Sequence, residues 1–270
     1  MGVPERQLVD VNGIQISYRQ TGAGPHLVLL HGLAGNARTW EIQFTSLSDS
    51  FRITAWDAPG YGVSDSLEAD VEVYADILNE FTKLIGIDST ILLGHSMGGI
   101  IAGNFAGRFP KRVRGLVLSC TLLGRKQPKG QPLGQNYITR LKQFDELSAL
   151  EYGRIRAKTM TAPGCDPTVL ERFAGIAAET KREGLAAGIR VVSESNNEGT
   201  FANLNMPVLV IAGELDQTVT RESTEDMIAA VPDTVPVLTV RYLPGVAHAP
   251  YMEDPETYNT VIQEFFSSLR

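Results

Sequence analysis

The chain has 270 residues, of which 43% are hydrophobic and 20% charged, and its formal net charge is −7. This length allows one large core, either as one domain with an insertion or as two domains. An acidic balance without a basic block argues against a nucleic-acid or membrane partner. Two cysteines, Cys120 and Cys165, form neither a disulfide framework nor a metal-ligand cluster, so we expect no metal and no cofactor.

The apolar runs have the length of strands, far below what a membrane span needs. Residues 1–6 lack the apolar core of a signal peptide, and Arg6 stands where a myristoylation motif needs Ser or Thr. We therefore expect a cytoplasmic monomer or homodimer whose partner is a small-molecule substrate. A leader outside this sequence would be compatible with export.

The first third of the chain predicts four strands and a helix. Residues 8–20 alternate between apolar and polar side chains around Asn12-Gly13, which predicts a hairpin. A continuous apolar run at 27–30 predicts a strand that is covered on both faces, and residues 53–56 predict a second buried strand. Apolar residues at helical spacing over 73–85, followed by Gly86, predict a helix and its end.

Strands and helices alternate as far as residue 120 and again from residue 206. Beyond the first third, the strands are expected at 91–93, 115–119, 208–212 and 237–243, and the helices at 100–109, 221–231 and from Asp254 onward. The last helix should carry these residues on its core side: Tyr258, Val261, Ile262, Phe265, Phe266 and Leu269. The alternation predicts a mainly parallel sheet with helices on both faces.

The segment between these two parts has no apolar strand. Amphipathic stretches predict helices at about 136–150, 150–160, 167–178 and 181–193. We therefore assign residues 1–120 and 206–270 to a core domain. Residues 121–205 become a helical insertion packed over one edge of the sheet.

A nucleophile candidate lies at Gly94-His95-Ser96-Met97-Gly98, between an apolar run and a helical pattern. Glycines on both sides would let Ser96 adopt a strained conformation with its side chain exposed. The pentapeptide by itself is equally compatible with a glycine-rich connection.

Three polar residues each follow an apolar strand: Ser96, Asp216 and His248. In an open parallel sheet, that edge is where ligands bind. A serine hydroxyl needs a base to take its proton, and the base needs an acid to orient it. Glu214 and Asp57 are the rivals of Asp216 for the acid.

Five motifs in this order together resemble those of the α/β-hydrolase superfamily. The resemblance implies an α/β fold with a mainly parallel eight-stranded sheet, flanking helices and a helical cap. It also implies Ser96 as nucleophile, His248 as base and then acid, and Asp216 as orienting acid. The matching segments are His31-Gly32, Asp57 to Ser64, Gly94 to Gly99, Gly213 to Asp216 and Gly245 to His248.

The tetrahedral intermediate needs two backbone N–H donors. Met97, at the start of the helix after the nucleophile, should supply one, and the helix dipole favours negative charge there. By resemblance, Leu33 supplies the other. His31 is interpreted as a loop organiser and His95 as packing beside the nucleophile, whereas His26 has no evident role. Four histidines without metal-ligand spacing argue against a metal site.

Serine at the nucleophile position disfavours the dehalogenase and epoxide-hydrolase branches and favours an acyl-enzyme. The sequence is most similar to the group of 3-oxoadipate enol-lactonases, carboxylesterases and hydrolases of ring-cleavage products. The resemblance therefore implies a serine hydrolase of a small carboxylic ester or lactone. A C–C bond hydrolase of ring-cleavage diketones and a hydrolase-fold small-molecule receptor are the alternatives.

Substrate contacts are expected from the oxyanion loop, the insertion and the segment after the histidine. For the aromatic residues of the insertion, packing onto the sheet is the alternative role. Among the cationic candidates Arg125, Arg140, Arg154 and Arg156, none stands out in the sequence as a carboxylate clamp. The candidate pocket residues are Gly32, Trp40, Tyr137, Phe144, Tyr152, Met160, Phe173, Ala249 and Tyr251.

Overall fold

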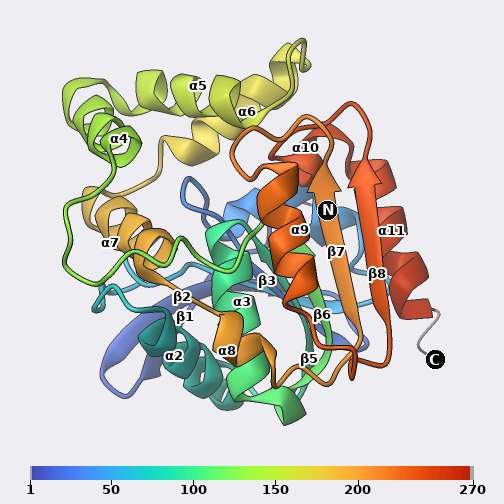
Figure 1. Ribbon diagram of the computed structural model, residues 1–270. Coiled ribbons are helices and arrows are strands. Elements are labelled where there is room, and N and C mark those ends of the chain that lie inside the picture. The colour runs from blue at the N-terminus through green and yellow to red at the C-terminus, as the bar shows by residue number, and fades with distance from the viewer. Residues whose placement is uncertain (1, 268–270) are drawn as a thin grey trace.

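A sheet of eight strands forms the centre of the computed structural model, which describes residues 2–267 (Figure 1). The strand order is β1-β2-β4-β3-β5-β6-β7-β8. The pairs β1–β2 and β2–β4 are antiparallel, and the other five neighbouring pairs are parallel, which confirms the mainly parallel sheet. The strands are β1 Arg6–Val11, β2 Ile14–Thr21, β3 His26–Leu30, β4 Arg52–Trp56, β5 Thr90–His95, β6 Val113–Ser119, β7 Val208–Gly213 and β8 Leu238–Leu243.

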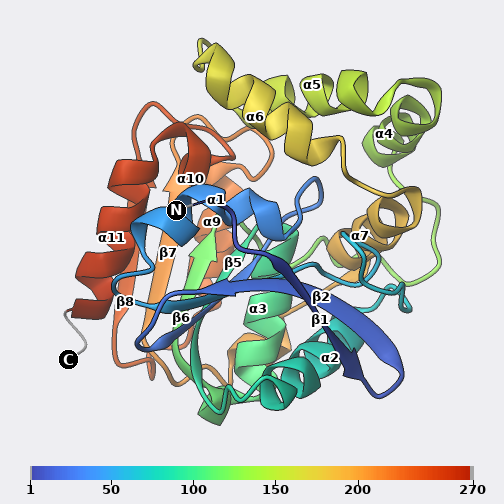
Figure 2. The ribbon, with the colours of Figure 1, turned by 180° about the vertical axis from the view of Figure 1, so that it is seen from behind.

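The central strands are mostly apolar because helices cover both of their faces. In β5, Leu92 joins the buried cluster on one face, whereas Ile91 and Leu93 join the cluster on the other. One face is covered by α2, α3 and α9, and the opposite face by α1, α10 and α11 (Figure 2). These helices are α1 Glu41–Ser46, α2 Val71–Leu84, α3 Met97–Arg108, α9 Arg221–Ala229, α10 Pro250–Glu253 and α11 Pro255–Ser267.

Five helices fill the inserted segment, and two of them begin at a side-chain cap. Ser148 and Glu151 form a capping box at the start of α5, and Asp166 caps α6 ahead of Pro167. In both ribbon views, α4, α5 and α6 lie above the carboxyl ends of the strands. The five helices are α4 Gln135–Glu146, α5 Ala149–Met160, α6 Pro167–Ala177, α7 Arg182–Glu194 and α8 Glu198–Phe201.

The last part of the insertion does not lie over the sheet edge, in contrast to the prediction. Helix α8 packs beside α3, and a Cβ atom at Gly107 would come within 2.1 Å of the carbonyl oxygen of Thr200. Small residues on α3 therefore make room for the returning chain. Helix α7 contributes Leu185 and Ile189 to the same buried cluster as α2 and α3.

The predicted helices and strands are present, with ends that shift by a few residues. The 3₁₀ helices η1 Ala37–Trp40 and η2 Pro110–Arg112 and the short helices α1, α8 and α10 had no counterpart in the sequence analysis. Leu269, expected on the core side of the last helix, lies outside the described residues. No helix among residues 2–267 combines the length and apolar character needed to cross a bilayer.

Candidate active site

Ser96 occupies a sharp turn between β5 and α3 and has a positive φ of 53°. Such a conformation is costly for a residue with a side chain and must be held by its surroundings. The Ser96 N–H donates to the carbonyl oxygen of Ser119 at 2.9 Å, and the Thr121 hydroxyl donates to the carbonyl of Ser96 at 2.7 Å. A Cβ at Gly94 would lie 2.2 Å from the carbonyl oxygen of Gly98, so strand and helix can approach only with glycine there.

The structure brings Ser96, His248 and Asp216 into one chain of contacts. His248 Nε2 lies 3.0 Å from Ser96 Oγ, and His248 Nδ1 lies 2.7 Å from Asp216 Oδ2. The other carboxylate oxygen of Asp216 accepts from the N–H groups of Thr218 at 2.8 Å and Val219 at 3.0 Å. An imidazole placed in this way can accept the hydroxyl proton while the buried carboxylate stabilises its charged form.

The two rivals of Asp216 lie elsewhere. Glu214 is exposed on the surface of the loop. Asp57 is buried, but its carboxylate accepts hydrogen bonds from the hydroxyl of Ser17 and from the N–H of Ala37. Asp57 therefore ties together the loops around the end of β4, and Asp216 is the acid in contact with the histidine.

The loop that carries His248 is fixed by Glu253, a residue that the sequence analysis missed. One carboxylate oxygen of Glu253 accepts from the N–H groups of Ala247 and Ala249, both at 3.0 Å, and the other accepts from Ala162 at 2.6 Å. The N–H of His248 itself donates to the carbonyl of Met160 at 2.9 Å. Burial raises the pKa of Glu253 against the effect of these donors. Glu253 thus fixes the position of the histidine loop relative to the inserted segment.

The loop that carries Gly32 and Leu33 lies directly against Ser96. A Cβ atom at Gly32 would come within 3.1 Å of Ser96 Cβ, and the carbonyl of Leu33 accepts from the Tyr61 hydroxyl at 3.2 Å. Met97 is the first residue of α3, where a backbone N–H has no partner within the helix. These positions are compatible with the expected donors Leu33 and Met97, whose role stays a prediction.

Two further histidines organise the surroundings. His31 Nε2 accepts from the N–H of Ala58 at 3.0 Å while its Nδ1 lies 2.8 Å from the carbonyl of Gly32, so His31 bridges two loops as expected. The His95 ring centre lies 4.9 Å from that of His248 and 4.8 Å from that of Tyr251. Burial and the nearby His248 hold the pKa of His95 well below its ordinary value, so His95 stays neutral.

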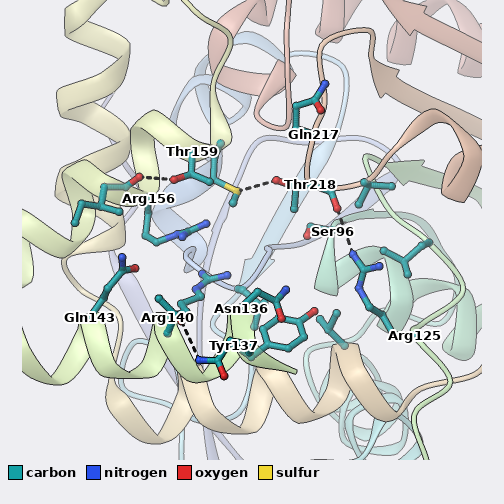
Figure 3. A pocket seen from close by; sticks show the side chains of 18 residues that line it. Ser96, Arg125, Asn136, Tyr137, Arg140, Gln143, Arg156, Thr159, Gln217 and Thr218 are labelled. Carbon is teal, nitrogen blue, oxygen red and sulfur yellow. Dashed lines mark hydrogen bonds between the residues drawn. The ribbon is translucent and has the colours of Figure 1, made fainter. Parts of the chain in front are cut away.

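A cavity of about 550 Å³ extends from Ser96 beneath the inserted helices (Figure 3). Of the expected pocket residues, Tyr137 and Met160 line it. A smaller cavity of about 40 Å³ shares Ser96, Leu33, Arg140, Met160 and Thr218 with it. The smaller cavity also includes the expected Gly32, Phe173 and Tyr251, together with His248.

Four expected pocket residues line neither of these two cavities, because packing uses them instead. Trp40 is completely buried, and its ring centre lies 5.1 Å from that of Tyr251. Phe144 and Tyr152 pack edge to face with centres 5.0 Å apart. Ala249 has no exposed surface and follows His248 into the fold.

Arginines are lining residues that the sequence left undecided. Arg125, Arg140 and Arg156 line the large cavity, whereas Arg154 is exposed and pairs with Glu171 at 3.0 Å. A signal was present in the spacing: Arg140 follows Tyr137 by three residues, and Arg156 precedes Met160 by four. These offsets place each pair on one helix face.

Among residues 2–267, one group of potential metal ligands includes Asp216 and His248. Its chemistry does not contradict the place of these two residues in the candidate active site. The potential ligand atoms of Cys120, Asp216 and His248 lie within 4.8 Å of one another. Burial raises the pKa of the Cys120 thiol well above its ordinary value, so the thiolate that a metal would need is disfavoured. The other two side chains already hydrogen-bond to each other.

Comparison with known proteins shows the family and the fold of the chain. A family model described as the alpha/beta hydrolase fold matches residues 25–255. A pimeloyl-[acyl-carrier protein] methyl ester esterase of Yersinia enterocolitica is 29% identical over 88% of this chain and 92% of its own. The solved enol-lactonase of Burkholderia xenovorans superposes with a TM-score of 0.83 at 20% identity, covering 97% of this chain and all of its own. A thermophilic esterase from Thermogutta terrifontis gives 0.84 at 24% identity, over 98% of both chains.

Proposed function

Because the chain belongs to the alpha/beta hydrolase fold family, we propose that it is a serine hydrolase that cleaves a small carboxylic ester or lactone. The observation that carries the proposal is the continuous contact from Ser96 Oγ through His248 to Asp216, at 3.0 and 2.7 Å. The relative named a methyl ester esterase supports an ester bond as the target.

In the first half of the reaction, Ser96 Oγ attacks the carbonyl carbon while His248 Nε2 takes the hydroxyl proton. Asp216 stabilises the imidazolium, and the N–H groups of Leu33 and Met97 stabilise the oxyanion. The tetrahedral intermediate then expels the alcohol oxygen, which receives the proton from His248. An acyl group remains on Ser96, and in a lactone the alcohol stays attached to that acyl group.

Water completes the second half of the reaction. His248 takes a proton from the water as it attacks the acyl carbon, and the intermediate collapses with return of that proton to Ser96 Oγ. The carboxylic acid leaves, and the side chains regain their starting protonation states.

Covalent labelling tests this proposal directly. A fluorophosphonate should modify the wild-type protein at Ser96, as located by peptide mass spectrometry, and should abolish hydrolysis of 4-nitrophenyl acetate in parallel. Ser96→Ala should lose both labelling and turnover while it unfolds at an unchanged temperature. Wild-type turnover by Ser96→Ala would exclude the proposed nucleophile.

A further inference from the structure

The large cavity carries a charge opposite to that of the whole chain. The chain has a formal net charge of −7, yet the described residues that line the cavity include three arginines and no Asp or Glu. Neutral amides, among them Asn136 and Gln143, supply further hydrogen-bonding groups. A positive, partly enclosed cavity attracts anions and strengthens their binding.

Two of the arginines are almost fully buried. Arg140 on α4 retains 9% of its exposure and Arg156 on α5 retains 8%. Figure 3 shows both side chains reaching into the cavity from these two helices. The Arg140 Nε donates to the Tyr152 hydroxyl at 3.1 Å, whereas Arg156 Nε is buried without a hydrogen-bond partner. Within residues 2–267, neither guanidinium has a carboxylate within ion-pair distance.

Burial without an acid is unfavourable for these two cations. A buried cation is stable only when an anion or several acceptors compensate for lost hydration. Burial and the neighbouring charge of Arg140 lower the pKa of Arg156 to about 10. Arg154, two residues away on the same helix, is by contrast exposed and paired with Glu171. Among the described residues, Arg140 and Arg156 face inward and have no acid partner, whereas the outward-facing Arg154 has one.

We propose that Arg140 and Arg156 bind a carboxylate of the substrate, so that the hydrolysed ester or lactone is an anion. This inference rests on the proposed function, since it places the scissile carbonyl at Ser96. Arg140 lines both cavities, and the smaller one also contains Ser96 and His248. One molecule can therefore contact the nucleophile and the arginines together. A guanidinium offers paired N–H donors that match a carboxylate.

Arg125 has a different place in this site. It is exposed, and its guanidinium donates to the carbonyl of Thr218 at 3.3 Å. Its position at the rim suits attraction of an incoming anion more than fixed binding. The carboxylate is therefore assigned to Arg140 and Arg156.

Matched substrate pairs test the inference. On the acyl side, the pair is the 4-nitrophenyl monoester of adipate and the corresponding 4-nitrophenyl adipamate. On the alcohol side, it is 4-acetoxybenzoate and 4-acetoxybenzamide. For at least one pair, kcat/KM should favour the carboxylate by about tenfold or more, which corresponds to about 1.4 kcal/mol. Equal kcat/KM within both pairs would overturn the inference.

Variants then assign the preference to residues. Arg140→Gln and Arg156→Gln should each lower kcat/KM for the preferred carboxylate by about tenfold through KM, and leave its neutral partner within about twofold. The matched control is Arg154→Gln, which removes an exposed cation from the same helix and should change neither value. An equal loss in Arg154→Gln, or an equal loss for the neutral partner, would contradict a specific contact. Thermal unfolding of each variant shows that it is folded.

Binding separates this inference from the proposed function. If the wild-type protein turns over no ester of either pair, the hydrolase proposal fails, and titration calorimetry with adipate still tests the arginines. Adipate should bind to Ser96→Ala, and the added changes Arg140→Gln and Arg156→Gln should weaken binding by about tenfold or more. Absence of adipate binding to Ser96→Ala would overturn the carboxylate assignment.

Discussion

Two groups of side chains near Ser96 differ in how their polar atoms are satisfied. His248 and Asp216 at the strand ends are called the floor, and Arg140 and Arg156 on the helices above are called the roof. At the floor, both oxygens of Asp216 and both ring nitrogens of His248 have partners within the protein. At the roof, Arg140 and Arg156 are buried and have no acid within ion-pair distance in the part of the chain that the structure describes. The proposed catalytic side chains therefore already contact one another at the strand ends, whereas the arginines on the helices above have donor groups left to bind a substrate.

Breaking the floor should have the largest effect. Asp216→Asn keeps the shape of the side chain but removes the charge that stabilises the imidazolium, so kcat for 4-nitrophenyl acetate should fall by about 10⁴-fold. Steady-state kinetics measure this fall. Glu214→Gln, two residues away and exposed, should stay within about twofold. A small loss in Asp216→Asn would remove Asp216 from the proposed catalytic machinery.

Lowering the pH should reduce kcat/KM through the binding of a single proton. His248 accepts a proton only when it is neutral, so kcat/KM for 4-acetoxybenzamide should fall about tenfold per pH unit on the acid side. The pKa of His95 is held far below its ordinary value, so His95 should add no second proton. A pH–rate profile with a limiting acid slope of one supports this, and a slope of two or a flat profile contradicts it.

Glu253→Gln tests the contact between the histidine loop and the inserted segment. An amide can still accept from Ala247 and Ala249, but its NH₂ group would face the N–H of Ala162. The histidine loop should shift, and kcat should fall by about 10- to 100-fold with KM for a neutral ester nearly unchanged.

Glu256→Gln, an exposed carboxyl in the first turn of α11, is the matched control for Glu253. Thermal unfolding and kinetics should be measured on both variants. A lower unfolding temperature in Glu253→Gln with an unchanged kcat would show a structural role alone.

The smallest expected effect is a gain of stability at the roof. Arg156→Met removes a buried cation that lacks an acid, so the free energy of unfolding should rise by about 1 kcal/mol, while Arg154→Met should change it by less than about 0.5 kcal/mol. Chemical denaturation measures both changes. Marked destabilisation by Arg156→Met would indicate that Arg156 serves the fold rather than the substrate.

Local patterns predicted most of the fold, because each long strand or helix has a characteristic periodicity of apolar residues within its own segment. The hairpin, the buried strands and the four long helices of the insertion were all placed to within a few residues. Helix α10 and the pair η1–α1 were missed because they are too short for a periodic signal. The path of α8 beside α3 was missed because it depends on small residues of a distant helix.

The candidate site divides in the same way. The proximity of Ser96, Asp216 and His248 could be predicted because each follows a strand and parallel strands end at one edge of the sheet. The fold class, the position of the sharp turn and the three side chains proposed for the chemistry could all be predicted from the sequence. Three features required the folded chain: Glu253 holds the histidine loop, Trp40 packs in the core, and Arg140 and Arg156 face the cavity without an acid among residues 2–267. Those features depend on contacts between segments far apart in the chain, and no local spacing encodes them.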